Sequence, residues 1–261
     1  MQTTARRPVY PDLAGKVVVV TGGSGGIGAA TCRLFAANGA KVAVNGRNPA
    51  RIQAVVDAIR QGGGQAVGVV ADCTDPAAVQ QLSREVEQQL GPAEVLAAFV
   101  GGGRARPGPV AQVSVEDWHS TVDGTLTATF LTLKGFLPGM IQRGRGVVLT
   151  MASSAARLPG LGAPAPYVAG KAGVIMLTRE VAGEVGRHGV RVNCLAPHTI
   201  LTEQIQQRAP EQWRQQMAAA VPLGRLGTPE DVALAAVFLA SDSAAWITGV
   251  TLDVAGGYVM T

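Results

Sequence analysis

Residues 16–28 read K-V-V-V-V-T-G-G-S-G-G-I-G, and this stretch decides the fold. The run 16–21 is apolar and β-branched, which is typical of a strand buried on both faces of a parallel sheet. Glycines follow at 22–28, and the apolar A-A-T-C-R-L-F-A-A after them indicates a helix. Glycines let a backbone approach a pyrophosphate closely, and a helix N-terminus supplies free N–H groups and a positive dipole end. The stretch predicts a phosphate-binding turn between the first strand and the first helix.

Six further apolar runs have the length and composition of buried strands. They are residues 41–45, 66–71, 95–100, 146–151, 190–195 and 250–254. Residues 48–61 and 75–90 between them carry helical spacing. The alternation predicts a Rossmann-type, doubly wound α/β fold, a seven-stranded parallel sheet with helices on both faces. No linker or repeat divides the sequence, so we expect one domain over residues 1–261, with 1–12 as a loose N-terminal extension.

Composition narrows the classes of partner. The chain is 47% hydrophobic and only 15% charged, which indicates a compact folded protein. Its net charge of +4 comes from basic residues that are scattered rather than gathered on a face, so we expect no nucleic-acid partner. No run reaches the roughly 18 apolar residues of a membrane span, and no secretory signal opens the chain. We therefore expect a cytoplasmic protein that does not enter a membrane.

Cysteines and histidines give no sign of a metal site. Cys32, Cys73 and Cys194 are too widely spaced for a disulfide framework or a metal knuckle, which favours a reducing cytosol. The histidines also lie far apart without carboxylates at ligand spacing. We expect no bound metal.

The ends of the second and third strands indicate which nucleotide is bound. NAD-specific sites place a carboxylate on the ribose 2′-hydroxyl at the end of the second strand, but Gly46 occupies that position and Arg47 follows. Arg47 can bind a 2′-phosphate through a charge-assisted fork, which favours NADP(H) over NAD(H). The alternative is a solvated arginine at a strand end. Asp72, after the third strand, is placed to accept a hydrogen bond from the adenine amino group.

The sequence Y-V-A-G-K at residues 167–171 suggests proton-transfer chemistry. Tyr167 and Lys171 are four residues apart, so on a helix they share one face. A phenol titrates near pH 10 in water, and a nearby ammonium lowers that pKa toward a useful value. Tyr and Lys at this spacing also occur by chance on many helices, so the pair needs other motifs beside it.

Those motifs are present, in a familiar order. T-G-x-x-x-G-x-G at 21–28, Asp72, Y-x-x-x-K at 167–171, R-V-N at 191–193 and I-T-G-V-T-L-D-V-A-G-G at 247–257 together resemble the classical short-chain dehydrogenase/reductase family. The resemblance runs from about residue 13 to residue 257. In general appearance the chain is most similar to bacterial ketoreductases, including 3-oxoacyl-carrier-protein reductases.

The resemblance implies roles for particular residues. Tyr167 would be the general acid or base, and Lys171 would lower its pKa and hold the nicotinamide ribose. A serine would polarise the carbonyl: counting along the fifth strand gives Ser153, whereas thirteen residues before Tyr167 gives Ser154. We prefer Ser153, because a strand register tolerates insertion less than the Pro-rich loop that follows. The implied nucleotide contacts are Gly22, Ser24, Gly26, Ile27, Gly28, Asn45, Arg47, Asp72, Cys73, Gly101, Lys171, Pro197, Ile200 and Thr202.

Three departures from the family pattern qualify these roles. Residues 98–101 are A-F-V-G where the family has N-N-A-G, and Thr125 stands where the family has a catalytic asparagine. A threonine can still bind a water, with one hydroxyl in place of a carboxamide. Pro197 is followed by His198 instead of glycine, so His198 either contacts substrate or cofactor or faces solvent. Two functions stay open: an NADPH-dependent reductase, and a nucleotide-binding protein with little or no turnover, for which Thr125 is the clue.

The loops after the strands bear on substrate and assembly. The expected substrate walls, residues 102–110, 158–166 and 199–223, are mostly apolar or Gln-rich, which favours a neutral, fairly hydrophobic ketone or aldehyde. Pro138 and Gly183 stand where carrier-protein reductases have basic residues, so a carrier-bound acyl substrate is the subordinate option. The resemblance also implies a homotetramer, or a homodimer, built on the helices near Trp118 and Tyr167 and on the C-terminal strand. An apolar stripe on the first of these helices could serve as interface or core and comprises Leu126, Phe130, Leu133 and Leu137.

Overall fold

A computed structural model describes residues 9–260 and contains the predicted seven-stranded parallel sheet. The strands are β1 (Val17–Thr21), β2 (Lys41–Gly46), β3 (Gln65–Val70), β4 (Val95–Ala98), β5 (Gly146–Met151), β6 (Val190–Pro197) and β7 (Thr251–Val254). Their order is β3-β2-β1-β4-β5-β6-β7, and every neighbouring pair is parallel. The chain reverses direction across the sheet between β1 and β4, where doubly wound folds bind ligands.

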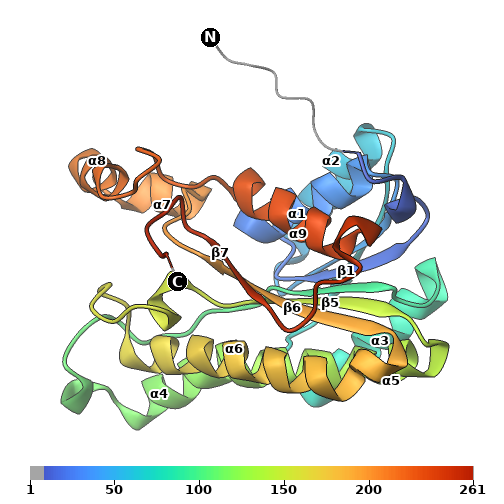
Figure 1. Cartoon of the computed structure of the whole chain (residues 1–261), viewed down its shortest axis with the longest axis horizontal. Helices are drawn as coiled ribbons and strands as arrows, with labels where there is room; N and C mark the ends of the chain where they lie inside the picture. Colours follow the sequence, from blue (N-terminus) through green and yellow to red (C-terminus); the bar gives the residue numbers. More distant parts are fainter. Residues whose placement is uncertain (1–8, 261) are drawn as a thin grey trace.

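Helices cover both faces of the sheet (Figure 1). One layer is formed by α1 (Gly26–Ala37), α2 (Pro49–Gln61) and α9 (Pro229–Ala240), and the other by α3 (Pro76–Leu90), α5 (Ala128–Arg143) and α6 (Ala165–Val185). Successive strand residues point to opposite faces. Val18 and Val20 accordingly enter the core beneath α1 and α9, whereas Val17 and Val19 enter the core beneath α3 and α5. Two buried faces explain why the strands are apolar along their whole length.

The helix starts follow from local capping. Asn48 accepts a hydrogen bond from the Arg51 N–H at 3.0 Å and begins α2, and Asp75 accepts from the Ala77 N–H at 2.9 Å and begins α3. In both helices a proline occupies the first turn, where its missing N–H costs nothing. At α9, Thr228 and Asp231 form a reciprocal capping box. The bounds of α2 and α3 lie within one residue of the predicted ranges, 48–61 and 75–90.

One helix layer is irregular beside the cleft. α4 (Val115–Val122) continues through a π-helical turn, η3 (Asp123–Thr127), into α5 without a break. Such π-turns occur mostly at functional sites. The fourth strand also ends two residues earlier than predicted, because the Phe99 N–H turns back to the Ala97 carbonyl and the Val100 N–H bonds to Thr21 Oγ1.

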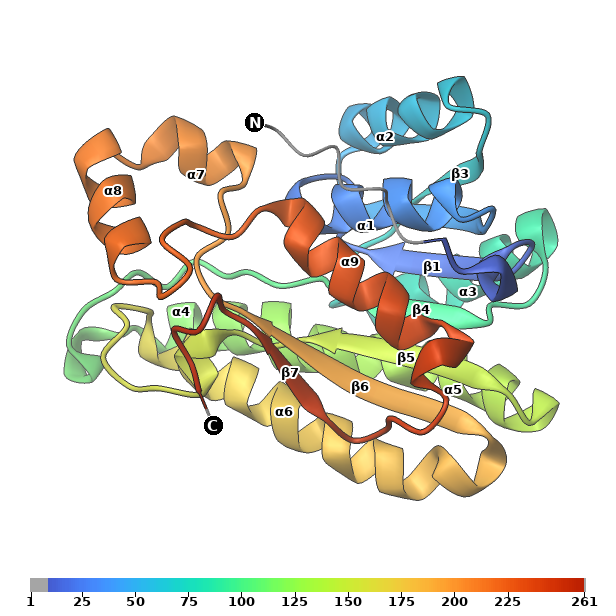
Figure 2. The same cartoon turned by 45° about the horizontal axis from the view of Figure 1, so that its top comes forward.

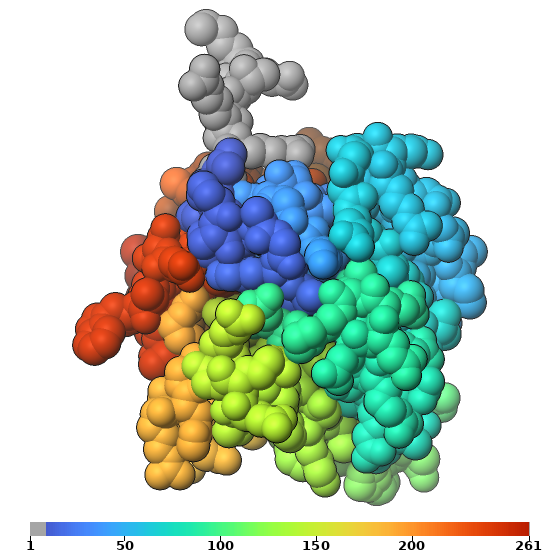
Figure 3. Space-filling view, turned by 90° about the vertical axis from the view of Figure 1, so that its right-hand side faces the viewer, coloured from blue at the N-terminus to red at the C-terminus, as the bar shows by residue number. Residues whose placement is uncertain are grey.

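The two ends of the molecule differ. The carboxyl ends of the strands meet a lobe formed by α7 (Glu203–Arg208) and α8 (Glu211–Ala219), which Figure 2 shows projecting from the body. Figure 3 looks onto the opposite end, where the N-terminal third, α3 and the segments around β5 pack side by side. The loops after β4, β5 and β6 therefore lie on the lobe side, as expected for a ligand site.

The inner part of the expected N-terminal extension is attached to the body. The Tyr10 N–H donates to Asn38 Oδ1 at 2.7 Å, and Leu13, in the 3-10 helix η1 (Pro11–Leu13), is fully buried. Asp12 accepts from Lys16 Nζ at 3.0 Å. The prediction that residues 1–12 are loose is wrong for 10–12, and residues 1–8 lie outside the described residues.

Candidate active site

The glycine turn is shaped for close approach by its backbone. Gly22 and Gly26 have φ values of +67° and +50°, which L side chains rarely adopt. A Cβ on Gly28 would lie 2.2 Å from the Gly22 carbonyl oxygen, so only glycine fits there. Gly25, the N-cap of α1, contributes no side-chain acceptor, and the first N–H groups of the helix face the turn without a side-chain cap. The turn can therefore hold a pyrophosphate, as the sequence predicts.

A cleft of about 800 Å³ opens from this turn across the ends of β2, β3 and β4. Of the predicted nucleotide contacts it is lined by Gly22, Ser24, Asn45, Arg47, Asp72, Cys73 and Gly101. The volume lies within the range of about 300–1,000 Å³ usual for ligand sites. Part of the expected substrate wall, Gly102, Gly103 and Arg104, also lines this cleft. Lining residues that the sequence reasoning missed include Phe99, Val100, Asp123 and Gly124.

Other predicted contacts border the turn or stand behind it. The Cβ position of Gly26 is 3.2 Å from Thr202 Cγ2, which brings the loop after β6 against the phosphate turn. Thr202 also caps α7. Pro197 and Ile200 are buried, and Ile200 bridges to Gly227. Ile27 packs against the core beneath α1, so its side chain faces inward.

At the end of the cleft next to β2 and β3, Arg47 and Asp72 face each other. Arg47 Nη1 lies 3.6 Å from Asp72 Oδ2, and Asp72 Oδ1 accepts from the N–H and the hydroxyl of Thr74 at 2.9 and 2.8 Å. The backbone N–H of Thr74, then its hydroxyl and then the nearby Arg47, hold the pKa of Asp72 below its ordinary value against the effect of burial. The Arg47 side chain is 79% exposed, so it can still reach a ligand.

Gly46 stands in the position where NAD-specific sites have an acid. A Cβ there would lie 2.7 Å from Ser24 Oγ, so a larger side chain would require Ser24 to shift. Asn45 and Cys73 were predicted to contact the nucleotide, and both line the cleft. Their polar atoms also serve the scaffold, because Asn45 Nδ2 donates to the carbonyls of Val69 and Ala71, and Cys73 Sγ bonds to Asn45 Oδ1 at 3.3 Å.

Tyr167 and Lys171 share one face of α6, as their spacing predicts. Lys171 is 3% exposed, its Nζ donates to the Met151 carbonyl at 2.6 Å and it lies 5.8 Å from the centroid of the Tyr167 ring. Burial lowers the pKa of Lys171 to about 8. Burial raises the pKa of Tyr167, against a smaller lowering by the hydrogen bond with Ser153. The sequence predicted that the ammonium would lower the phenol pKa, but in this structure desolvation dominates and the pKa of Tyr167 lies above its ordinary value.

The two candidate serines occupy different places. The Ser153 hydroxyl lies close enough to the Tyr167 phenol to lower its pKa, and the Ser153 Oγ accepts from the Ala155 N–H at 3.2 Å. Ser154 Oγ instead lies 2.8 Å from His198 Nδ1. The geometry therefore brings Ser153, Tyr167 and Lys171 together where β5 ends and α6 begins. Ser154 is the next residue after Ser153, and its hydroxyl bonds to His198 instead.

Thr125 lies in the π-turn and is fully buried. Its hydroxyl donates to the Thr121 carbonyl at 2.7 Å, so its one proton is used within its own helix. A Cβ on Gly170 would lie 2.2 Å from Thr125 Oγ1, which shows that the threonine packs directly on α6 one residue before Lys171. Thr125 thus spaces the two helices, and its hydroxyl can only accept a hydrogen bond from a water; that it still binds a water stays a prediction.

Comparison with known proteins agrees with this geometry. A family model described as enoyl-(acyl carrier protein) reductase matches residues 22–259. The chain belongs to the short-chain dehydrogenase/reductase family. It is 36% identical to 2,5-dichloro-2,5-cyclohexadiene-1,4-diol dehydrogenase of Sphingobium indicum, over 94% of this chain and 97% of that protein. It is 34% identical to the 3-oxoacyl-[acyl-carrier-protein] reductase of Escherichia coli, over 95% of this chain and 99% of that one.

Solved structures of short-chain dehydrogenases/reductases share the fold. A 7α-hydroxysteroid dehydrogenase in complex with NADH and 7-oxo glycochenodeoxycholic acid superposes with a TM-score of 0.90 at 33% identity, covering 97% of each chain. These findings place the chain among NAD(P)-dependent oxidoreductases. Within residues 9–260 no helix combines the length and hydrophobicity that crossing a membrane requires. The same residues contain no cluster of three or more His, Cys, Asp or Glu side chains placed to hold a metal ion.

Proposed function

We propose that this protein is an NADPH-dependent reductase of neutral, hydrophobic ketones or aldehydes, and that it also runs the reverse oxidation of the alcohol. The observation that carries the proposal is the meeting of Ser153, Tyr167 and Lys171 at the carboxyl edge of the sheet, beside a cleft that begins at the glycine turn. A phenol, a hydroxyl and a buried ammonium at one place are the groups that protonate a carbonyl oxygen.

The chain's own groups have the protonation states that reduction needs. Tyr167, with its raised pKa, carries its proton at neutral pH, and Lys171, with a pKa of about 8, is mostly an ammonium. Tyr167 donates its proton to the carbonyl oxygen while the Ser153 hydroxyl orients the same oxygen. The ammonium then stabilises the phenolate that is left. A bound nicotinamide would supply the hydride, held by the glycine turn and the residues that line the cleft.

NADP(H) is the favoured nucleotide because the cleft offers a cation, Arg47, where a 2′-phosphate would lie, and has no carboxylate at the Gly46 position. Arg47→Ala is expected to raise the Kd of NADPH by about 10- to 100-fold, the range for one charge-assisted hydrogen bond, and to leave the Kd of NADH nearly unchanged. Arg51→Ala, an exposed arginine on the first turn of α2, is the matched control. Equal weakening of both nucleotides by Arg47→Ala would sink the NADP(H) assignment.

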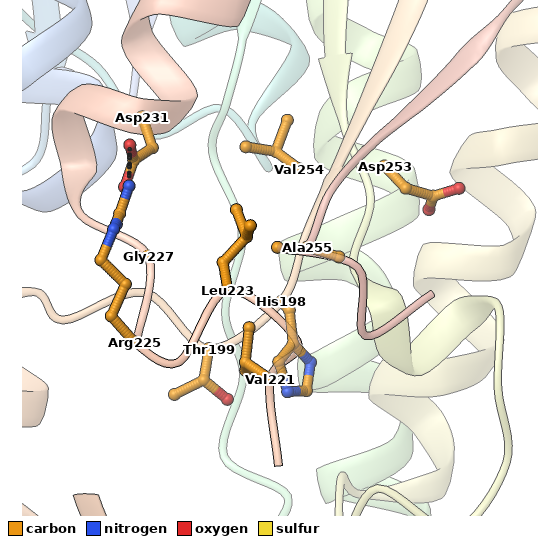
Figure 4. Close-up of a pocket in the computed structure, with 11 residues that line it drawn as sticks. His198, Thr199, Val221, Leu223, Arg225, Gly227, Asp231, Asp253, Val254 and Ala255 are labelled. Carbon is orange, nitrogen blue, oxygen red and sulfur yellow. Dashed lines mark hydrogen bonds and ion pairs between the residues drawn. The ribbon is translucent and has the colours of Figure 1, made fainter. Parts of the chain in front are cut away.

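The surroundings of the site support a neutral substrate. A pocket of about 290 Å³ adjoins His198 and is walled by apolar groups such as Val221, Leu223 and Val254 (Figure 4). Its cation, Arg225, is paired with Asp231 through two hydrogen bonds of 2.6 and 2.9 Å, which Figure 4 draws as dashed lines. A paired arginine has little attraction left for a carboxylate or phosphate on a substrate.

A nucleotide-binding protein with little or no turnover is the second candidate. It is favoured because the Thr125 hydroxyl already donates its one proton to the Thr121 carbonyl. The two are separated by following the absorbance of NADPH with a panel of cyclic, aromatic and aliphatic ketones, while nucleotide binding is measured in parallel. Consumption of NADPH with any of them establishes the reductase. Tight binding without consumption across the panel establishes the second candidate.

Assembly as a homotetramer, or a homodimer, in the cytoplasm is part of the same proposal. Exposed apolar side chains on the α4–α6 layer, Trp118, Phe130 and Met176, support contact with a second copy. A second set lies around the open edge of β7, with Trp246 fully exposed and Val250 and Leu252 about 40% and 36% exposed. The three cysteines are buried free thiols, which suits a reducing compartment. Light scattering on the purified chain reads the number of copies directly.

A further inference from the structure

His198 joins three segments that are far apart in the sequence. Its Nδ1 lies 2.8 Å from Ser154 Oγ in the loop after β5. Its ring stacks on Tyr258 of the C-terminal segment, with centroids 3.9 Å apart and planes 11° from parallel. His198 itself follows β6 directly, and its N–H bonds to the Val254 carbonyl at the end of β7. One side chain thus ties the ends of β5, β6 and β7.

A second contact ties the same loop to the same strand. Arg157 Nη2 lies 3.0 Å from Asp253 Oδ2, and the two side chains are only 18% and 15% exposed. An ion pair that is largely shielded from solvent is far more costly to break than an exposed one. The loop that carries Ser153 is therefore held at Ser154 and again at Arg157, both times by residues from β6, β7 or the segment after β7.

The position of this double attachment matters because Ser153 is the residue immediately before Ser154. The Ser153 hydroxyl lies beside the Tyr167 phenol, and Met151, two residues earlier, accepts from Lys171 Nζ at 2.6 Å. A displacement of the loop by about 1 Å is enough to reduce catalysis severely when a polarising group must meet a reacting oxygen. The loop must therefore be placed accurately. Its own regular structure is limited to a short 3-10 turn, η4 (Ser154–Ala156).

His198 also carries an unsatisfied atom. Its Nε2 is buried and has no hydrogen-bond partner among residues 9–260. Burial lowers the pKa of His198, so the ring is neutral at neutral pH. Groups that could face it across the contact are Ser154 and Arg157 from the loop, Asp253 from β7 and Tyr258 from the tail, and only Ser154 is bonded to the ring. Because Nε2 has no partner there, the hydrogen bond to Ser154 and the stack on Tyr258 are the contacts that hold the His198 ring in place.

We propose that His198 and Tyr258 are positioning residues, which hold Ser153 against Tyr167 through Ser154 and so make the C-terminal segment part of the active site. The proposal rests on the reductase function proposed above. It assigns a role to the histidine that replaces glycine after Pro197, to the second serine and to a tyrosine three residues from the end of the chain.

The hydrogen bond and the stack can be removed separately. His198→Phe keeps an aromatic ring on Tyr258 and loses Nδ1, and Ser154→Ala removes the bond from the other side. Each is expected to lower kcat by about 5- to 10-fold, the worth of one hydrogen bond, with the KM for the ketone and the Kd of NADPH within about twofold of the parent. Because the two changes remove the same bond, the double variant should be no slower than either single one.

The stack is tested with Tyr258→Ala and its conservative counterpart Tyr258→Phe. Loss of the ring should lower kcat in the same way as His198→Phe, and the phenylalanine, which retains the stack, should restore it. Met260→Ala in the same segment is the control, since the Met260 side chain is 81% exposed. A general weakening of the fold would instead change NADPH binding and would not be rescued by Tyr258→Phe.

Hydrogen exchange supplies a readout that needs no turnover. Amides of residues 152–158 should exchange several-fold faster in His198→Phe and Tyr258→Ala than in the parent, while those of α1 stay unchanged. Unchanged exchange in this loop, or parent-like kcat in Ser154→Ala and His198→Phe, overturns the proposal. Absence of turnover in the parent itself overturns the reductase function. The exchange experiment still decides whether His198 and Tyr258 hold the loop in place.

Discussion

The glycine turn and the cluster around His198 lie at the same edge of the sheet but are built in opposite ways. The turn is a continuous run of eight residues whose shape is set by backbone geometry, with Gly28 pressed against Gly22. The cluster is made of side chains from Ser154, His198 and Tyr258, which meet only in the folded chain. Under the proposed function, the first region would hold the pyrophosphate of the nucleotide, and the second would position the loop that carries Ser153. The comparison teaches that binding can be encoded locally while chemistry depends on distant segments.

The sharpest separation of the two regions comes from removing the proton donor. Tyr167→Phe is expected to lower kcat by about 10³-fold, within the usual range for a general acid, because no other described group stands at the Ser153 hydroxyl to give a proton. The Kd of NADPH should stay within about twofold, since Tyr167 is not among the residues that line the cleft at the glycine turn. Single-turnover absorbance and a binding titration check the two values. Parent-like reduction by Tyr167→Phe would contradict the mechanism.

The reverse separation comes from filling the turn. In Gly28→Ala the new Cβ would lie 2.2 Å from the Gly22 carbonyl oxygen, so the turn must open. We expect loss of measurable NADPH binding and about 1–3 kcal/mol of unfolding free energy, as for other overpacked sites. Gly25→Ala is the matched control for stability, because nothing lies within 4 Å of its Cβ position and its φ is −173°. Chemical denaturation of both variants measures the difference, and equal stability would show that the turn is not rigid.

The smallest effect expected is the change in the rate of reduction with pH. The pKa of Lys171 is lowered from 10.5 to about 8 by burial, so the ammonium persists below that pH and is lost above it. The rate of reduction should be level at neutral pH and fall by up to about tenfold for each unit above the Lys171 pKa, because a neutral amine does not stabilise the phenolate. Oxidation of the alcohol, which needs the phenolate, should instead gain as pH rises. A reduction rate that stays level well above the Lys171 pKa would show that Lys171 does not stabilise the phenolate. The Kd of NADPH, measured over the same pH range, is the control.

Much of the fold was predictable because a parallel sheet covered on both faces leaves a distinctive pattern. All seven strands and the first capped helices lie where the apolar runs and the Asn48 and Asp75 caps predict. The end of β4 was predicted two residues too late, because residues 99 and 100 are as apolar as the strand and only the bond from Val100 to Thr21 shows the turn. The N-terminal contacts of Tyr10 and Asp12 were missed for the same reason, since their partners lie elsewhere in the chain.

Within the site, spacing along one helix was predictable and relations between segments were not. The shared face of Tyr167 and Lys171 follows from the helical period. The raised pKa of Tyr167 could not be predicted, because the extent of its burial depends on loops after other strands. Placement of Ser153 at the phenol and of Ser154 at His198 required the path of the Pro-rich loop.

The amino-acid sequence by itself determined the order of strands and helices, the phosphate turn and the pairing of a phenol with an amine, because each depends on residues within one or two turns of chain. Only the tertiary structure decided the protonation of that phenol, the choice between two serines and the attachment of the C-terminal segment to the site. Desolvation and side-chain hydrogen bonds depend on which distant groups come within a few ångströms, and no local spacing specifies that.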